Sequence, residues 1–218
     1  PPAGEELADF YAIAVKDADD AHAKLGALVA ERIPERFGLD ALDDIQVLCP
    51  TNRGTLGART LNDVLRARLN PTPADSISRG ERTFAVHDRI MQVENDYERD
   101  VYNGDLGRLR RIDREGRTVE VRIDGRDLTY RFDDMDALQP AYAVTVHKAQ
   151  GSEYPAVVMV LARQHGRLLR RDLVYTGLTS ARRLAVVLIE ADAVARAVAG
   201  HRRDVRLTRL QRLLEPEP

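Results

Sequence analysis

The chain opens with a strand and a helix, judged by its pattern of apolar residues. Residues 10–15 are a short apolar run, and apolar side chains then recur at helical spacing from Asp17 to Ile33. Pro34 predicts the end of that helix, because a proline in a helix interior removes a hydrogen bond and clashes with the preceding turn. A second apolar run at 45–49 predicts another buried strand.

A loop and a second helix follow that strand. The loop contains Gly54, and apolar residues at helical spacing then predict a helix from near Leu56 to Leu69, just before Pro71. Residues 72–80 are rich in turn-forming side chains, so we expect a loop there that separates two structural units.

The rhythm changes to short alternating segments between residues 81 and 138. Turn pairs such as Asn103-Gly104 and Asp124-Gly125 separate these segments, as in β-hairpins. A meander of this length predicts a small, SH3-like β barrel. Its expected strands are 89–93, 107–113, 118–123 and 127–132.

Strands and helices return after residue 138. The apolar runs 156–161 and 184–189 are continuous, which is typical of parallel strands covered on both faces. We therefore expect an α/β domain formed by 1–80 and 139–214, interrupted by an inserted barrel at 81–138. Its further expected elements are a strand at 141–146 and helices near 168–173 and at 191–198.

Composition narrows the class of protein. The 218 residues are 44% hydrophobic and 31% charged with a net charge of -2, an ordinary globular composition. No apolar run approaches the ~20 residues that span a bilayer. The single Cys49 fits a reducing compartment and predicts a cytoplasmic protein, and the five histidines show no metal-ligand spacing. The chain starts with proline instead of methionine, so we expect it to be part of a longer protein.

The charge is unevenly distributed along the chain. Residues 1–44 hold eleven acidic and four basic side chains, a net charge of -7. Residues 141–212 hold thirteen basic and five acidic side chains, a net charge of +8. A basic C-terminal half is compatible with an anionic partner such as nucleic acid, and equally with solvated arginine-rich helix faces.

The stretch 145–153 is the strongest candidate for chemistry. It places polar side chains and a glycine between two apolar strands, at a sheet edge where α/β proteins bind ligands. Hydroxyl, ammonium and amide donors suit the phosphate oxygens of a nucleotide or a nucleic acid. An ordinary solvated loop is the alternative. The polar residues are Thr145, His147, Lys148, Gln150, Ser152 and Glu153.

Four ordered segments resemble the motifs of superfamily 1 DNA helicases of the RecD-like branch. TVHKAQGSEYPAVV, from Thr145, resembles motif V; DLVYTGLTSARRL, from Asp172, resembles motif VI. IQVLCPTNRGTLGARTLNDVLRARLN, from Ile45, is similar to the motif IV region, and DRIMQVENDYERDVYNGDLG, from Asp88, is similar to the start of the family's SH3-like domain. The resemblance extends from about Phe10 to Leu214.

The resemblance implies a motor of two RecA-like lobes that bind ATP between them and move 5′ to 3′ along single-stranded DNA. This chain would be the second RecA-like (P-loop NTPase-type) helicase domain with its SH3-like insertion. It has no G-x-x-x-x-G-K-[ST] phosphate loop, since none of its lysines, Lys16, Lys24 and Lys148, follows a glycine. ATP and Mg²⁺ would thus be bound mainly by an N-terminal lobe, and the chain alone would be inactive.

The expected partners are single-stranded DNA, that N-terminal lobe and the subunits of exonuclease V, without a membrane. The resemblance also assigns roles to residues. Arg53 would sense the γ phosphate, with DNA contact or a structural role as the alternative. Asn103 would either guide DNA or simply form a turn. The residues expected near DNA are Thr145, His147, Lys148 and Gln150, and those expected at the ATP cleft are Gly151 and Glu153. The alternative for His147 is a loop histidine bonded to neighbouring backbone.

Motif VI departs from the family pattern at one position. Ser180 stands where the family has an arginine that reaches the γ phosphate, and Arg182 and Arg183 follow. Counted along a continuing helix, Arg183 is the better substitute at the ATP site. A weakened motor, or a non-catalytic DNA-binding or protein-interaction module with a degenerate helicase fold, is the alternative. The arginines of 163–183 and His165 would form a positive DNA-binding patch, and Tyr142, Tyr154 and Tyr175 would stack on bases or serve as packing residues.

Overall fold

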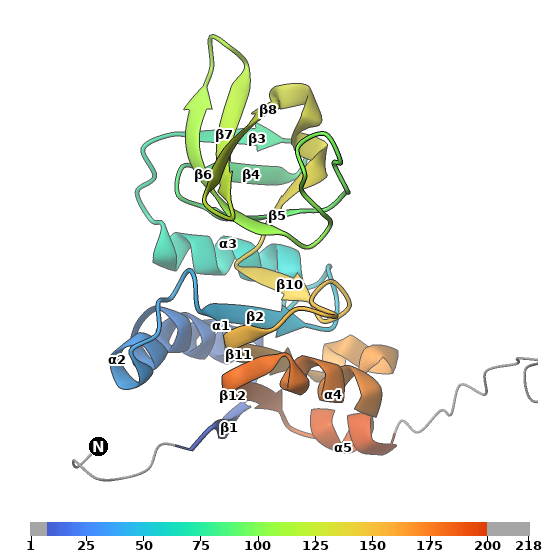
Figure 1. The fold of residues 1–218 in the computed structure, drawn as a ribbon. Coiled ribbons are helices and arrows are strands. Elements are labelled where there is room, and N and C mark those ends of the chain that lie inside the picture. The colour runs from blue at the N-terminus through green and yellow to red at the C-terminus, as the bar shows by residue number, and fades with distance from the viewer. Residues whose placement is uncertain (1–7, 200–218) are drawn as a thin grey trace, which may run out of the picture.

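A computed structural model describes residues 8–199 of the chain. Its centre is a five-stranded, fully parallel sheet (Figure 1). The sheet order is β1 (Phe10–Val15), β12 (Ala181–Glu190), β11 (Tyr154–Leu161), β2 (Ile45–Cys49) and β10 (Ala143–Thr145). The predicted parallel α/β layer is therefore confirmed. The part of 139–214 that begins at residue 200 lies outside the described residues.

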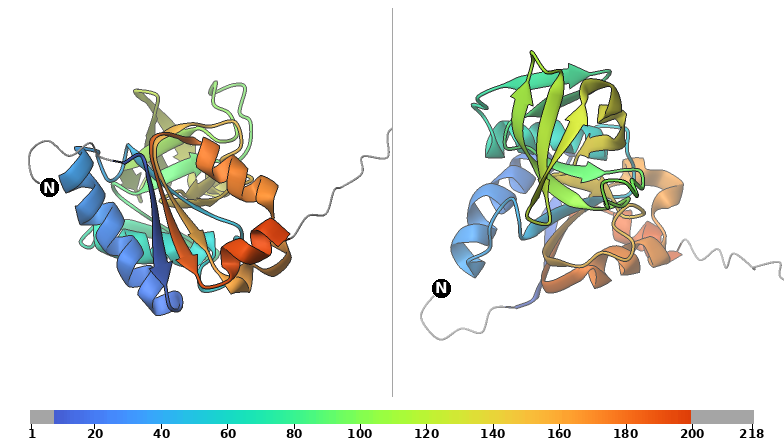
Figure 2. Two further views of the ribbon diagram at one scale, coloured as in Figure 1. Left: turned by 90° about the horizontal axis from the view of Figure 1, so that it is seen from below. Right: turned by 45° about the horizontal axis from the view of Figure 1, so that its top comes forward.

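Helices cover both faces of this sheet (Figure 2, left). One face packs against α1 (Ala18–Ala27), the π-helical turn η1 (Leu28–Arg32), α2 (Ile33–Phe37) and α3 (Ala58–Leu69). The other packs against α4 (Arg171–Thr179) and α5 (Ala193–Ala199). Val158 and Val160 point to the first face, and Val157 and Met159 point to the second. Alternate side chains of a strand enter opposite cores, which explains the continuous apolar runs.

The first helical segment does not end near Pro34, as its sequence predicts. It continues through η1 and α2 to Phe37. Pro34 is tolerated because it lies in the first turn of α2, where its missing N–H is not needed. The segment ends at Gly38, whose φ of 65° is left-handed and whose N–H donates to the Pro34 carbonyl at 2.9 Å.

An antiparallel unit is inserted between α3 and β10 (Figure 1). Its strands are β3 (Ser76–Arg79), β4 (Arg82–Ala85), β5 (Arg89–Gln92), β6 (Leu106–Asp113), β7 (Thr118–Ile123), β8 (Arg126–Arg131) and β9 (Leu138–Pro140), with a 3-10 segment η2 (Phe132–Ala137). β3 pairs with β4, and the other strands form a sheet in the order β8-β7-β6-β5-β9. The expected meander is confirmed, with Phe84, Leu109, Val121 and Tyr130 in its core. The expected loop at 72–80 is wrong, because β3 lies within it.

One buried carboxylate joins the inserted unit to the parallel sheet. Asp88 accepts hydrogen bonds from Asn70 Nδ2, at the end of α3, and from the Tyr142 hydroxyl, each at 2.9 Å. It also accepts from the Ala85 N–H at 2.8 Å. Burial raises the pKa of the Asp88 carboxyl. The entry and the exit of the inserted unit thus meet at a single side chain.

The edge strand β10 is fixed by a buried side chain of α3. Asn62 Nδ2 donates to the Ala143 carbonyl at 2.8 Å, and Asn62 Oδ1 accepts from the Ala143 N–H at 3.0 Å. The same amide donates to the Ala58 carbonyl at 2.7 Å. These bonds satisfy the outward-facing peptide groups of Ala143 and set the position of the loop that follows β10.

Candidate functional site

Two polar loops leave the carboxyl edge of the sheet side by side. β2 ends at Cys49 and β10 at Thr145, and these residues are direct neighbours in the parallel register. The Val146 N–H donates to the Cys49 carbonyl at 3.0 Å, which extends the pairing into the loop. The loop after β2 carries Arg53, so the sheet brings Arg53 and the stretch 145–153 to one edge.

The segment from 146 to 153 runs from the carboxyl end of β10 back to the amino end of β11, and it contains no helix. The N–H groups of Lys148 and Ala149 donate to the Thr145 carbonyl at 2.9 and 3.1 Å. Gly151 then adopts a φ of 87°, a conformation that favours glycine, and the chain enters the amino end of β11. Thr145 and Glu153 therefore lie at opposite edges of the sheet although eight positions separate them.

His147 and Gln150 line a hollow of about 160 Å³ beside α4. Its other walls include Arg170, Asp172 and Thr176. Within residues 8–199, the His147 imidazole makes no hydrogen bond, so it is not held by neighbouring backbone. The hollow offers an imidazole and an amide to a ligand from solvent.

Lys148 points toward the inserted unit. Its Nζ donates to Gln139 Oε1 at 2.6 Å, and Gln139 belongs to β9. Partial burial, together with repulsion from Arg82, lowers the pKa of the Lys148 ammonium. No carboxylate among the described residues pairs with it. Its charge remains available to an anion at this edge.

Arg53 lies in a tightly folded loop at the same edge. The Thr51 hydroxyl donates to the Arg53 carbonyl at 2.9 Å, and a Cβ on Gly57 would lie 2.4 Å from that carbonyl oxygen. Thr55 Oγ1 donates to Gln164 Oε1 at 2.8 Å and ties the loop to the segment that follows β11. The Arg53 side chain is exposed.

A second group of polar residues lies at the amino edge of the sheet. Arg182 Nε donates to Glu153 Oε2 at 2.7 Å, and both side chains are exposed. Ser180 is 5% exposed, and its hydroxyl donates to the Thr176 carbonyl at 2.9 Å. Tyr154 N–H donates to the Ser180 carbonyl at 2.8 Å, which joins the two segments. The residues that the resemblance assigns to ATP do not form one group, because Arg53 lies at the opposite edge.

Arg182 and Arg183 do not continue a helix, so the helical count that favoured Arg183 is wrong. α4 ends at Thr179 and β12 begins at Ala181. Tyr154 pairs with Ala181 and Ala156 with Leu184, so β12 holds one extra residue at this point, a β-bulge. Of the two arginines, Arg182 is the one directed to Glu153.

The expected helix near 168–173 and the expected positive patch also need correction. A 3-10 segment, η3 (Arg163–Leu168), precedes α4, which starts only at Arg171. Arg163 pairs with Glu190 at 2.9 Å, and Arg170 pairs with Asp172 at 2.9 Å. His165 is buried, and burial lowers the pKa of its imidazole, so it is a structural residue. Carboxylates thus offset part of the positive charge of this stretch.

Sequence reasoning missed two exposed aromatic side chains, Tyr97 and Tyr102. Tyr142 and Tyr154 are 3% and 4% exposed and cannot stack on bases, whereas Tyr175 on α4 is exposed. Tyr97 and Tyr102, in the loop between β5 and β6, are 77% and 45% exposed. The only sequence signal for their exposure is that both tyrosines lie among turn-forming Asn, Asp and Gly residues.

Asn103 lies in the same loop. Its backbone N–H donates to Asn95 Oδ1 at 2.9 Å, and Gly104 has a φ of 105°. The predicted turn is confirmed, and the Asn103 side chain remains exposed beside it.

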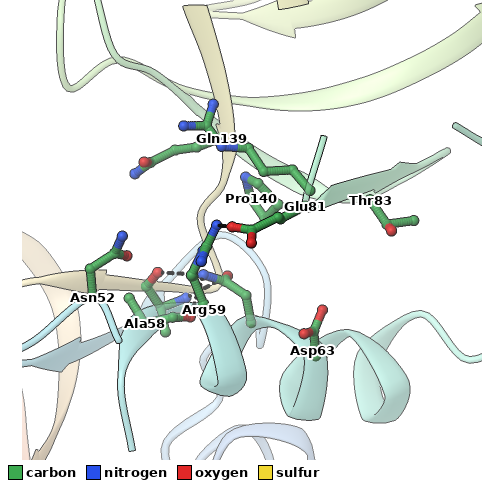
Figure 3. A pocket seen from close by; sticks show the side chains of 11 residues that line it. Asn52, Ala58, Arg59, Asp63, Glu81, Thr83, Gln139 and Pro140 are labelled. Carbon is green, nitrogen blue, oxygen red and sulfur yellow. Dashed lines mark hydrogen bonds and ion pairs between the residues drawn. The ribbon is translucent and has the colours of Figure 1, made fainter. Parts of the chain in front are cut away.

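A smaller hollow of about 100 Å³ lies where α3 meets the inserted unit (Figure 3). An ion pair between Arg59 and Glu81 crosses it, and Asn52 and Gln139 lie at its ends. The hollow separates the loop of Arg53 from β9. Arg59 is engaged by Glu81 of the same chain.

The described residues contain no cluster of three or more His, Cys, Asp or Glu side chains that could hold a metal ion. Among residues 8–199, none of the helices is long and apolar enough to cross a membrane.

Two protein-family models match the chain. The ATP-dependent RecD-like DNA helicase SH3 domain matches residues 61–123, and the UvrD-like helicase C-terminal domain matches residues 140–202. The first covers most of the inserted unit, and the second covers the stretch from β10 to α5.

Curated relatives and a solved structure agree with these matches. The chain is 40% identical over 139 residues to the ATP-dependent RecD2 DNA helicase of Deinococcus radiodurans, covering 63% of the chain and 19% of that protein. It is 31% identical over 182 residues to the RecBCD enzyme subunit RecD of Mycolicibacterium smegmatis, covering 84% of the chain and 31% of that protein. The crystal structure of a Bacteroides Pif1 helicase with ADP-AlF3 and ssDNA has a TM-score of 0.51 at 16% identity, covering 82% of the chain and 49% of that structure. The chain thus spans about a third or less of these two curated relatives, and the structural likeness shows a shared fold.

Proposed function

This chain belongs to the RecD-like family of superfamily 1 DNA helicases, and on that premise we propose that it is the second RecA-like lobe of an ATP-dependent motor. The motor would move 5′ to 3′ along single-stranded DNA. One observation carries the proposal. A single short segment links the candidate DNA residues at the carboxyl edge, from Thr145, with the candidate nucleotide residues at the amino edge, at Glu153. Such a segment can transmit a change at one edge to the other.

At the carboxyl edge, we propose that four side chains contact the DNA backbone. The Thr145 hydroxyl, the His147 imidazole and the Gln150 amide offer hydrogen-bond donors, and Lys148 offers a positive charge without a carboxylate partner. The position of Arg53 at this edge supports its DNA or structural role over γ-phosphate sensing. DNA would therefore contact both loops that leave β2 and β10.

At the amino edge, we assign ATP to Gly151, Glu153 and Arg182, with Ser180 behind them. The exposed ion pair between Arg182 and Glu153 is weak and can open. Glu153 would then accept a ribose hydroxyl, and Arg182, in place of Arg183, would approach the γ phosphate. A phosphate loop with its Mg²⁺ would come from the N-terminal lobe, and when bound it neutralises charge on the β and γ phosphates. ATP between the lobes would favour closure, and hydrolysis would release it.

A second candidate function follows from Ser180. A buried serine hydroxyl supplies no positive charge to a phosphate, and an arginine at such a position accelerates hydrolysis by roughly 10³ to 10⁵. Loss of that charge would suit a non-catalytic DNA-binding or protein-interaction module. Membership of an exonuclease V complex is a further proposal, drawn from the relatives named as RecBCD subunits.

DNA binding by the 218-residue chain tests the first part of the proposal. We expect the chain to bind an oligothymidylate and to lose affinity for it as the salt concentration rises from about 50 to 200 mM. The variant Lys148→Ala should bind the oligothymidylate more weakly than the wild-type chain. Lys24→Ala is the matched control, because Lys24 pairs with Asp20 and donates to the Ala14 carbonyl of β1, the strand at the other side of the sheet from β10. Salt-independent binding, or equal loss in the control, would refute the DNA assignment.

ATP turnover tests the second part. The 218-residue chain alone is expected to show no DNA-stimulated turnover, and measurable turnover would contradict our assignment of the phosphate loop to another lobe. In the full-length protein, we expect low turnover that rises in Ser180→Arg and falls further in Arg182→Ala, with Arg183→Ala as the control. Full turnover in Arg182→Ala would show that the cleft is completed differently.

A further inference from the structure

A loop of the inserted unit presents two aromatic rings, in contact with each other, to solvent. We call residues 94–105 the tyrosine loop. The rings of Tyr97 and Tyr102 contact each other edge to face, with centroids 6.2 Å apart and planes at 78°. Tyrosine rings of this kind normally lose much of their exposed apolar area in a core or against a partner. Their joint exposure in one loop therefore indicates a binding surface.

The tyrosine loop is held in a fixed conformation. Asp96 and Val101 exchange two backbone hydrogen bonds of 2.8 and 3.0 Å, and the Val101 side chain is fully buried. The Tyr102 N–H donates to Asp105 Oδ2 at 2.7 Å. The Tyr102 hydroxyl donates to Asp100 Oδ1 at 2.9 Å, which fixes that ring. A rigid aromatic pair binds a flat ligand without a large loss of conformational entropy.

The tyrosine loop emerges on the same side of the molecule as the candidate DNA residues. β5 begins at Arg89, whose guanidinium donates to the Leu42 and Ile45 carbonyls at the amino edge of the sheet. It then runs to Met91, opposite Gln139, the residue that binds Lys148. The chain after β5 therefore extends toward the carboxyl edge, as both views of the inserted unit show (Figures 1 and 2, right).

The charge of the tyrosine loop decides which part of a nucleic acid it can take. The loop contains five acidic side chains and one basic side chain. Such a surface repels phosphates, so it would accept bases and leave the backbone to Lys148 and its neighbours. Stacking on an aromatic ring needs no charge and accepts every base. The side-chain amide of Asn95 lies beside the rings, where it donates to the Tyr97 hydroxyl at 3.3 Å, and its second N–H can donate to a base edge.

We propose that Tyr97 and Tyr102 form a base-stacking subsite for single-stranded nucleic acid on the inserted unit. The proposal rests on the proposed DNA-binding function and extends it from the parallel sheet to the tyrosine loop. A strand held by its phosphates near His147 and Lys148 would place successive bases against the two rings. The subsite would add affinity that does not depend on salt.

The test compares two probes and two double variants of the 218-residue chain. The probes are an oligothymidylate and an abasic oligomer of the same length. The double variant Tyr97→Ala/Tyr102→Ala is expected to bind the oligothymidylate about tenfold more weakly, because stacking contributes about 1 to 3 kcal/mol per base. Tyr97→Phe/Tyr102→Phe keeps both rings and should bind within about twofold of wild type. All three proteins should bind the abasic oligomer equally, and the tenfold difference should persist at raised salt.

Other outcomes would overturn the proposal in distinguishable ways. Equal weakening toward both probes would show that the rings act only through the fold of the loop. No weakening in the Ala variant, while Lys148→Ala still binds poorly, would remove the subsite and leave the DNA assignment intact. Tighter binding of an arginine-rich peptide than of DNA, lost in the Ala variant, would identify a protein-docking loop. No binding of either DNA probe by the wild-type chain would refute the proposed function as well.

Discussion

Replacing Asn62 by alanine tests how strongly α3 holds β10. The substitution removes three hydrogen bonds of 2.7 to 3.0 Å and leaves the N–H and the carbonyl of Ala143 without their outward partner. A buried polar group left without a partner costs about 1 to 3 kcal/mol. Alanine is the better helix former by about 0.5 kcal/mol. We therefore expect a loss of about 2 to 4 kcal/mol in the free energy of unfolding.

Urea and thermal unfolding of the 218-residue chain measure this loss. For a chain of this size, 1 kcal/mol corresponds to about 2 to 4 °C in Tm, so a fall of about 4 to 16 °C is expected. Asp63→Ala is the matched control, because Asp63 is the next residue of α3, is exposed and pairs only with Arg66. The control should change stability by less than about 0.5 kcal/mol. Equal effects of the two substitutions would refute the idea that Asn62 fixes the edge strand.

Three further predictions follow from particular contacts. Gly57→Ala places a Cβ 2.4 Å from the Arg53 carbonyl oxygen, so the loop must shift, and we expect weaker DNA binding and a loss of about 1 to 3 kcal/mol by urea unfolding. Gly26→Ala is the control, because its backbone is helical and its Cβ would meet no atom closer than 3.9 Å. Because burial lowers the pKa of His165 in the fold, the unfolded chain binds a proton more readily, so stability should fall as the pH drops below 6.5, and His165→Gln should reduce that slope in pH-dependent melting. Gly107→Ala brings a Cβ within 2.6 Å of the Arg122 carbonyl oxygen and should lower Tm by disturbing the pairing of β6 with β7, whereas an unchanged Tm would contradict the packing described.

The elements that could be predicted from the sequence are those whose side chains are buried in a hydrophobic core. The apolar runs of β2, β11 and β12 leave no choice but a strand covered on both faces, and the turn pairs marked the hairpins. β3 escaped prediction because only Ile77 of its four residues packs inward, so no alternation was visible. The end of the first helix was predicted too early, at Pro34. A rule based on the α-helical period does not anticipate the π-helical turn that precedes this proline.

The candidate residues could be chosen from the sequence, but their arrangement around the sheet could not. The polar character of 145–153 was visible, whereas the crossing of the sheet by that segment depends on Gly151 and on the pairing of β11 with β12. Because the helix changes to a strand after Ser180, the helical count that favoured Arg183 does not apply, and Arg182 is the arginine that pairs with Glu153. The exposure of Tyr97 depends on tertiary contacts that no local pattern records.

The carboxylate of Asp88 gives the inserted unit a mechanical property. Its bonds to Asn70 and Tyr142 connect the two points where the chain enters and leaves that unit. Tension between α3 and β10 would load this link together with the bonds of Asn62 to Ala143, before it reached the strands between. Once the link breaks, about 250 Å of contour could be drawn out, at about 3.5 Å per residue. As long as these bonds hold, Asp88 keeps such a load away from the tyrosine loop.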